Sequence, residues 1–213
     1  MVEGLYKAVL FDLDGTLLDS DQANRISIRR LFSEFTGIQV VDKQIDSLFG
    51  LSSWEVVHRI VPGMEQILLD TWMIYLEDLH QHTQLFHGVE DMLNTLGQAG
   101  ISMGVVTSQD RRELDIVCSY IQLNKWIRYW ITADDVQHEK PHPEGVLAVL
   151  SALDCQPKDA ILIGDTRYDL EAGRAAGTAV GLSLWGRQYS SPRLEHQADF
   201  VFNHPQEIAQ LCL

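Results

Sequence analysis

Short apolar runs that alternate with helical patterns are the feature that most constrains the fold of this chain. The runs that we expect to form buried strands are residues 8–11, 101–106, 126–131, 160–163, 180–184 and 198–202. Helical periodicity covers residues 89–96, 111–121, 145–153 and 168–176, and Pro205 begins a terminal helix. Because strands and helices alternate in this way in parallel crossovers, the pattern predicts an α/β fold with a doubly wound parallel sheet.

Residues 19–84 interrupt this alternation. They contain helical patterns at 23–35, 53–60 and 65–79 and no convincing strand. Trp54, Trp72 and Tyr75 lie at helical spacings within the segment and are expected in its core. Because the segment directly follows the first strand, we expect an all-helical cap (19–84) inserted into a core made of residues 1–18 and 85–213.

Length, charge and cysteine content exclude several classes of protein. The 213 residues are enough for one core with a modest insertion. The net charge of -14 argues against nucleic acid as a partner, although local basic groups still allow a small anionic substrate. Three scattered cysteines without CxxC spacing fit a reducing compartment, and no stretch approaches the roughly 18 apolar residues of a membrane-spanning helix. We expect a cytoplasmic protein without a membrane partner, either a monomer or a small homo-oligomer.

Two carboxylates stand at the end of the first predicted strand. Asp12, Leu13, Asp14, Gly15 and Thr16 follow residues 8–11 directly. Side chains two residues apart on a strand point the same way, and open α/β sheets bind ligands at the carboxyl ends of their strands. Two close carboxylates need a cation or a shared proton, so a Mg²⁺ site is one interpretation and a polar Asp-Gly turn is the other.

Further polar residues follow other predicted strands and should meet the first pair at the same edge of the sheet. Thr107 and Ser108 follow 101–106, while Asp165 and Asp169 follow 160–163. Lys140 lies in a loop before a proline-containing helix start. His138 and His142 flank this lysine, and we assign them to the loop and the helix start rather than to acid–base chemistry.

This set of residues suits phosphoryl transfer, which needs a nucleophile, a metal and donors for the phosphoryl oxygens. Asp12 can attack phosphorus and form an aspartyl-phosphate. Asp165 can complete the metal site with Asp12, and Asp169 can bind or orient behind it. The remaining three residues can hold phosphate oxygens, and they are Thr107, Ser108 and Lys140.

Four motifs in this chain resemble those of the haloacid dehalogenase superfamily, in its order and over essentially the whole length. They are Asp12-Leu13-Asp14-Gly15-Thr16, Thr107-Ser108, Lys140-Pro141-His142-Pro143-Glu144 and Gly164-Asp165-Thr166-Arg167-Tyr168-Asp169. The resemblance implies a Rossmann-like core, a small helical cap and Mg²⁺-dependent phosphomonoester chemistry on a small phosphorylated metabolite. We therefore expect an enzyme, a phosphatase of this superfamily.

The resemblance also implies roles for individual residues. Asp12 is the nucleophile, and Asp14 protonates the leaving oxygen and then activates water, while its backbone carbonyl meets Mg²⁺. The implied metal set is Asp12, Asp14, Asp165 and Asp169, and the implied phosphate set is Thr16, Thr107, Ser108 and Lys140. A substrate-specificity loop is expected in the cap at Phe49, Gly50, Leu51 and Ser52.

Single residues favour or disfavour particular branches of the superfamily. Asp14 disfavours the dehalogenases and the phosphonoacetaldehyde hydrolases, which lack an acid there. Asn24 stands where the phosphoglucomutase branch usually has a histidine, which disfavours that branch without excluding it. Trp185-Gly186 is similar to a turn of phosphoglycolate phosphatases and pyrophosphatases. We expect a phosphoglycolate phosphatase-like hydrolase, and the alternatives are a phosphosugar mutase, an inorganic pyrophosphatase and a receiver-like phospho-aspartate switch.

Overall fold

A parallel sheet forms the centre of the molecule. The computed structural model describes residues 5–186 and 192–213. The six-stranded sheet has the order β5-β4-β1-β6-β7-β8, and all of its strand pairs are parallel. Its strands are β1 (Ala8–Phe11), β4 (Ser102–Val106), β5 (Tyr129–Ile131), β6 (Ala160–Gly164), β7 (Ala179–Ser183) and β8 (Phe200–Phe202).

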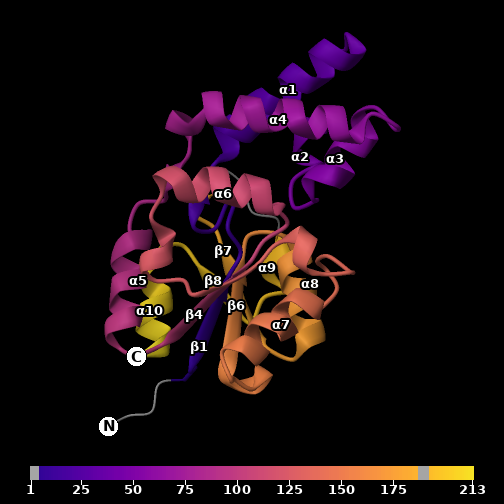
Figure 1. Ribbon diagram of the computed structural model, residues 1–213. Helices are drawn as coiled ribbons and strands as arrows, with labels where there is room; N and C mark the ends of the chain where they lie inside the picture. The colour runs from indigo at the N-terminus through magenta and orange to yellow at the C-terminus, as the bar shows by residue number, and fades with distance from the viewer. Residues whose placement is uncertain (1–4, 187–191) are drawn as a thin grey trace.

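Helices cover both faces of this sheet, as the alternation in the sequence predicts (Figure 1). One face packs on α5 (Val89–Gln98), α6 (Arg111–Tyr120) and α10 (Gln206–Cys212), and the other packs on α7 (Glu144–Ala152) and α8 (Arg167–Ala176). Strand β1 is buried on both sides: Val9 and Phe11 join the first cluster, while Ala8 and Leu10 join the second. The α/β fold class is confirmed.

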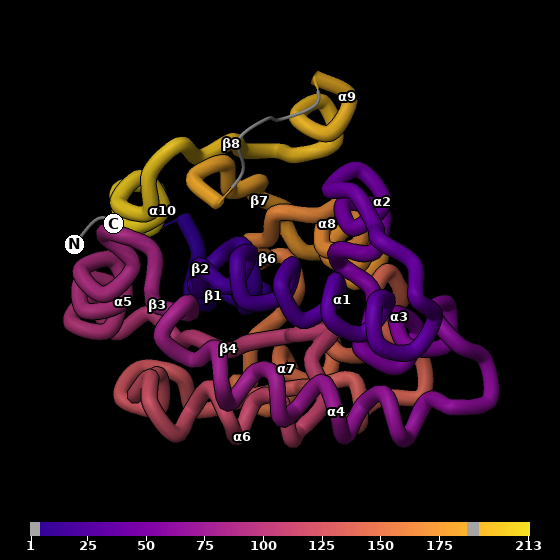
Figure 2. The backbone as a smooth tube through the Cα atoms, turned by 90° about the horizontal axis from the view of Figure 1, so that it is seen from above, coloured from indigo at the N-terminus to yellow at the C-terminus, as the bar shows by residue number. Residues whose placement is uncertain are grey.

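The helical insertion lies beyond the carboxyl ends of the strands (Figure 1). Its helices are α1 (Asp21–Thr36), α2 (Asp42–Asp46), α3 (Ser53–Ile60) and α4 (Glu65–Asp78). They enclose a hydrophobic cluster of their own, in which Leu31, Val57 and Leu68 are fully buried. Seen from above, α4 runs beside α6 of the core, and Arg112 pairs with Asp70 at 2.6 Å between these two helices (Figure 2).

The chain enters and leaves the insertion through a short antiparallel strand pair that the sequence did not predict. The pair consists of β2 (Leu18–Asp19) and β3 (Gln84–Leu85). Two residues per strand are too few to show a period-2 pattern. The short elements η1 (His80–His82), η2 (Leu123–Lys125), η3 (Ala133–Asp135), η4 (Pro157–Asp159) and α9 (Pro192–Glu195) complete the described chain.

Two local expectations are wrong. The strand predicted at 126–131 covers only Tyr129–Ile131, because η2 and the helical backbone of Trp126 precede it. Trp54 is 54% exposed, whereas Trp72 is buried at 4%. Trp54 follows Ser53 at the start of α3, where it lies outside the hydrophobic cluster. None of the helices in the described part of the chain is long and apolar enough to cross a membrane.

Candidate active site

A cleft of about 1210 Å³ opens where the carboxyl ends of the strands face the helical insertion. The core contributes Asp12, Asp14, Thr107, Ser108, Lys140 and Asp165 to its wall. The insertion contributes Phe49, Gly50 and Leu51. The cleft therefore brings together residues that are far apart in the sequence, and it is large enough for a small-molecule ligand.

The ammonium group of Lys140 lies at the centre of the buried charges. Its Nζ donates to Asp12 Oδ1 and Asp169 Oδ1, each at 2.6 Å, and to the carbonyl oxygen of Val106 at 3.1 Å. The side chain is only 5% exposed. Burial alone would lower the pKa of Lys140, but the two carboxylates raise it above its usual value, so the group stays charged.

Three aspartates form a buried cluster, and two of them contact this cation. One carboxylate oxygen from each of Asp12, Asp165 and Asp169 lies within 4.8 Å of the others. Burial raises the pKa of Asp12 well above its usual range, the charge of Asp169 raises it further, and Lys140 opposes both. Three carboxylates against one ammonium leave two negative charges, and all the donors are oxygens. A hard divalent cation such as Mg²⁺ fits this donor set.

Gly15 permits the close approach of Asp165. A Cβ at this position would lie 2.6 Å from Asp165 Oδ2, and the backbone φ of +76° also favours glycine. The Asp-Gly pair therefore has a second role besides turn formation, because it leaves space for a carboxylate from another strand end.

Asp14 has different surroundings from Asp12. It is half-buried, and its two carboxylate oxygens accept hydrogen bonds from Ser20 Oγ at 2.5 Å and Gln109 Nε2 at 2.7 Å. Burial raises the pKa of Asp14, and the two hydrogen bonds partly offset this effect. A carboxyl group with a raised pKa is suited to give and take protons. Sequence reasoning missed Ser20 and Gln109, although the position of Gln109 directly after Thr107-Ser108 was a usable signal.

The residues predicted to hold phosphate divide into two groups. Thr107 and Ser108 line the cleft with Lys140. The hydroxyl of Thr107 accepts the N–H of Gln109 at 3.1 Å. Thr16 departs from the prediction: it is fully buried, and its hydroxyl lies 3.2 Å from Ser183 Oγ. Its side chain does not line the cleft.

Asp169 connects Lys140 to the start of α8. Its Oδ2 accepts from the Thr166 N–H at 2.9 Å and from Thr166 Oγ at 2.5 Å, while its Oδ1 accepts from Lys140. A Cβ on Gly164 would approach Asp169 to 2.3 Å, so the turn needs glycine here. Both oxygens of Asp169 are thus engaged by protein donors, which favours the orienting role over direct metal binding.

The loop of the insertion lies against the core. Phe49, Gly50 and Leu51 line the cleft, and Ser108 Oγ donates to the carbonyl oxygen of Gly50 at 3.4 Å. Ser52 departs from the predicted substrate contact. It is buried at 3% and accepts the Glu55 N–H at 3.4 Å as the N-cap of α3, because a helix start needs such an acceptor.

Glu113 is a cleft residue that sequence reasoning missed. It is 4% exposed, and one of its oxygens accepts from Ser53 Oγ at 2.5 Å and from the Asp110 N–H at 2.9 Å. Burial, with a smaller contribution from the charge of Asp110, raises the pKa of Glu113 to about 8. Its spacing from Asp110 signals a capping box, but not the contact with α3.

Comparisons with known proteins agree with this geometry. A family model of haloacid dehalogenase-like hydrolases matches residues 9–182. A pyrophosphatase PpaX of Bacillus pumilus is 27% identical over 209 residues, which cover 98% of this chain and 97% of that protein. One from Bacillus cereus is 29% identical over 204 residues, covering 94% of this chain and 93% of the relative.

Solved structures show the same fold. A protein of Lactobacillus plantarum proposed to be a phosphoglycolate phosphatase superposes with a TM-score of 0.86 at 25% identity, covering 97% of this chain and 99% of that one. CbbY of Rhodobacter sphaeroides, solved in complex with phosphate, has a TM-score of 0.81 at 20% identity, covering 95% of this chain and 96% of its own.

Proposed function

Because this chain belongs to the haloacid dehalogenase-like hydrolases, we propose that it is a Mg²⁺-dependent phosphatase that hydrolyses a small phosphorylated metabolite through phospho-Asp12. One observation carries the proposal. Asp12 and Asp165 lie in one buried cluster with Lys140, on the floor of a cleft that Asp14 also lines. This arrangement offers a nucleophile, an acid–base group and cationic stabilisation at one place.

The proposed reaction has two steps. In the first, a carboxylate oxygen of Asp12 forms a bond to phosphorus, the bond from phosphorus to the leaving oxygen breaks, and Asp14 gives its proton to that oxygen. In the second, the Asp14 carboxylate takes a proton from water as the water oxygen forms a bond to phosphorus, and the bond from phosphorus to the Asp12 oxygen breaks, which releases phosphate and restores the Asp12 carboxylate.

The other residues bind and orient. We assign the phosphoryl oxygens to Thr107, Ser108 and Lys140, because these side chains line the cleft next to Asp12. Mg²⁺ would be held by Asp12, Asp165 and the backbone of Asp14, and when bound it offsets the negative charge of the phosphoryl group. Asp169 positions Lys140 through the 2.6 Å contact.

We further propose that residues 19–84 act as the cap of a core made of 1–18 and 85–213. The leaving group then lies between the phosphate site and the loop that contains Phe49, Gly50 and Leu51. In this arrangement the core residues carry the chemistry, while the cap loop contributes to the choice of substrate.

The test is a phosphatase screen over phosphoglycolate, sugar phosphates, nucleotides and pyrophosphate, with and without Mg²⁺. Asp12→Asn keeps the side-chain shape and is expected to lower kcat by at least about 10³-fold on the best substrate. Circular dichroism and a thermal unfolding curve check that the variant is folded. A folded Asp12→Asn protein with full activity would remove the basis of the proposal.

Inorganic pyrophosphatase is the second candidate, and the relatives named pyrophosphatase PpaX favour it. The same two steps apply, with phosphate as the leaving group. The ratio of kcat/KM for pyrophosphate to kcat/KM for the best phosphomonoester decides between the two candidates. A ratio well above one identifies a pyrophosphatase, and a ratio well below one identifies a phosphomonoesterase.

A further inference from the structure

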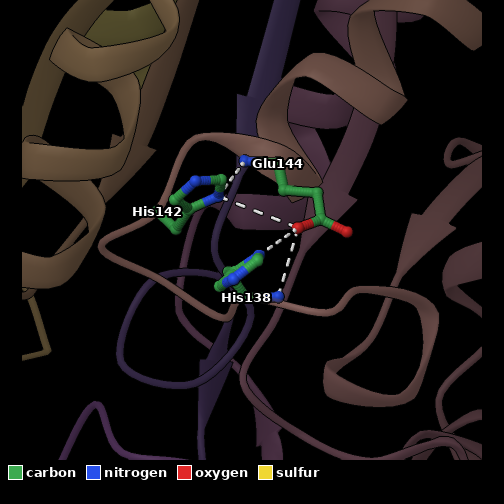
Figure 3. A group of neighbouring side chains, drawn as sticks. All are labelled: His138, His142 and Glu144. Atoms are coloured by element: carbon green, nitrogen blue, oxygen red, sulfur yellow. Dashed lines mark hydrogen bonds and ion pairs between the residues drawn. The ribbon is translucent and has the colours of Figure 1, made fainter.

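A second group of possible metal ligands lies on the loop that carries Lys140. It consists of His138, His142 and Glu144, and the two imidazoles face the carboxylate of Glu144 (Figure 3). The Nδ1 atoms of His138 and His142 lie 3.0 Å and 3.8 Å from Glu144 Oε2. The two imidazole rings are 4.6 Å apart. The three ligand atoms lie within 4.8 Å of one another.

These separations match those around a tetrahedral zinc ion. With bonds of about 2.0–2.1 Å to nitrogen and oxygen, neighbouring ligand atoms stand about 3.3 Å apart. The two nitrogen-to-oxygen distances in this cluster lie on either side of that value. Small rotations of the exposed imidazoles would therefore equalise them without moving the backbone.

The carboxylate is already held in place by the backbone. Glu144 Oε1 accepts the N–H of Gln137 at 2.8 Å, and Oε2 accepts the N–H of His138 at 3.1 Å. These contacts fix the orientation of the carboxylate, and a metal ion at Oε2 would replace the hydrogen bond that this oxygen makes with His138 Nδ1. The Nδ1 of His142 accepts the Glu144 N–H in a long contact of 3.3 Å, and a metal bond at this nitrogen would replace that contact.

From this geometry we propose that His138, His142 and Glu144 bind one borderline-soft divalent metal ion, of which Zn²⁺ is the representative. Two imidazole nitrogens and one carboxylate prefer Zn²⁺ over Mg²⁺, whereas the buried aspartates offer oxygen only. Both histidines are exposed, so the ion enters from solvent. The site is separate from the aspartate cluster and does not depend on the proposed reaction.

The position of this site has a consequence for Lys140. His138 and His142 lie on either side of Lys140 in the sequence, each two residues away from it. A bound ion therefore joins the two sides of the segment that presents the lysine. Zinc binding should make this segment more rigid, which amide hydrogen exchange can measure without any activity assay.

The experiment is a calorimetric titration of the full chain with Zn²⁺ in excess Mg²⁺, at a pH where histidine is neutral. The double variant His138→Ala/His142→Ala is expected to bind one Zn²⁺ fewer than the wild type. Each single variant should weaken this site at least about tenfold, because a three-ligand site becomes a two-ligand site. Zn²⁺ should also slow exchange of residues 137–145 in the wild type and not in the double variant.

His58→Ala is the matched control. It removes an exposed histidine that pairs with Glu65 at 2.6 Å in the cap, away from the proposed site. This variant should keep the wild-type stoichiometry and affinity. Unchanged zinc stoichiometry in the folded double variant overturns the proposal, and so does an equal loss in His58→Ala.

Discussion

At the scale of single residues, Asp12 and Asp14 differ in what surrounds them. Asp12 accepts a hydrogen bond from a buried ammonium group, whereas Asp14 accepts from one hydroxyl and one amide. The ammonium favours the ionised form of Asp12, which a nucleophile needs. Burial nevertheless keeps the pKa of both carboxyl groups above the usual value, and the charge of Asp169 raises that of Asp12 further. We assign the attack to Asp12, because it lies in the buried cluster with Lys140 and Asp165, and the proton transfer to Asp14, which lines the cleft outside that cluster.

Asp14→Asn tests this division of roles. With p-nitrophenyl phosphate, whose leaving group needs no proton, the variant should still form phospho-Asp12 and release about one nitrophenolate per chain in a burst. Later turnover should fall by about 10²–10⁴-fold, because water is no longer activated. Rapid-mixing absorbance measures both phases, and Asp12→Asn should show no burst. A burst in Asp12→Asn, or unchanged turnover in Asp14→Asn, contradicts the assignment.

Lys140→Met tests the buried charges through stability. The variant leaves Asp12 and Asp169 buried without their shared cation, which should cost about 3–5 kcal/mol of unfolding free energy in Mg²⁺-free buffer. Urea unfolding measures the loss. Lys7→Met is the control, because its ion pair with Asp159 is exposed and should contribute less than about 1 kcal/mol. Equal losses in the two variants would mean that the buried cluster has no special role in stability.

The predicted lysine and carboxylates of the site lie close together in the structure, whereas two of the predicted hydroxyl residues lie away from the cleft. Asp12, Lys140 and Asp165 follow strand ends or a loop, and the sheet topology alone brings them to one edge. Thr16 and Ser52 stand in equally suitable positions, but one packs against Ser183 and the other caps α3. The direction of a short hydroxyl side chain depends on packing and local backbone hydrogen bonds, and spacing does not encode either.

At the scale of elements, the contact between α3 and α6 joins the insertion to the core through a titratable group. Ser53 Oγ of α3 donates to Glu113 of α6 at 2.5 Å. Glu113 also completes the capping box of its own helix with Asp110. A single carboxyl group therefore connects the start of α6 to the start of α3, and its protonation state affects both.

The stability of the protein should depend on pH through Glu113. Its pKa is about 8 in the folded chain against the usual 4.5, so between these values the folded state holds a proton that the unfolded state has lost. The unfolding free energy should therefore fall as pH rises through this window, by up to about 1.4 kcal/mol per pH unit. Glu113→Gln keeps the capping geometry and does not titrate. The unfolding free energy of this variant should therefore fall less steeply with pH than that of the wild type.

Urea unfolding at intervals from about pH 5 to pH 8 measures both slopes. Glu55→Gln, at an exposed glutamate paired with Arg59, is the matched control and should keep the wild-type slope. Parallel slopes for Glu113→Gln and the wild type would mean that this carboxyl group titrates normally.

The longer elements were predictable from the sequence and the shortest ones were not. The predicted helix at 53–60 has the same bounds as α3, and the one at 168–176 begins one residue late relative to α8. Helix α2 and the β2–β3 pair were missed, because five-residue helices and two-residue strands are set by tertiary contacts rather than by periodicity. Trp54 was misplaced because helical spacing does not tell which face of α3 is covered.

At the scale of the whole molecule, the net charge of -14 repels itself and attracts cations. Cations in general should stabilise this protein by screening its self-repulsion. Binding at the aspartate cluster should add a separate effect, because that cluster exists only in the folded state. The two effects can be separated, since screening depends on ionic strength and binding depends on the particular ion.

Removal of Mg²⁺ should accordingly lower the stability of the folded chain. An ion that binds only the folded state raises the unfolding free energy by about 2.7 kcal/mol at one hundred times its Kd. Thermal unfolding in Mg²⁺ should therefore give a higher Tm than unfolding in EDTA with sodium chloride at equal ionic strength. In Asp165→Asn this difference should largely disappear, because the variant removes one carboxylate of the cluster. Asp91→Asn, at an exposed position in the first turn of α5, should retain it. If sodium chloride reproduced the whole effect of Mg²⁺ in the wild type, the stabilisation would come from screening, and the aspartate cluster would not be a metal site.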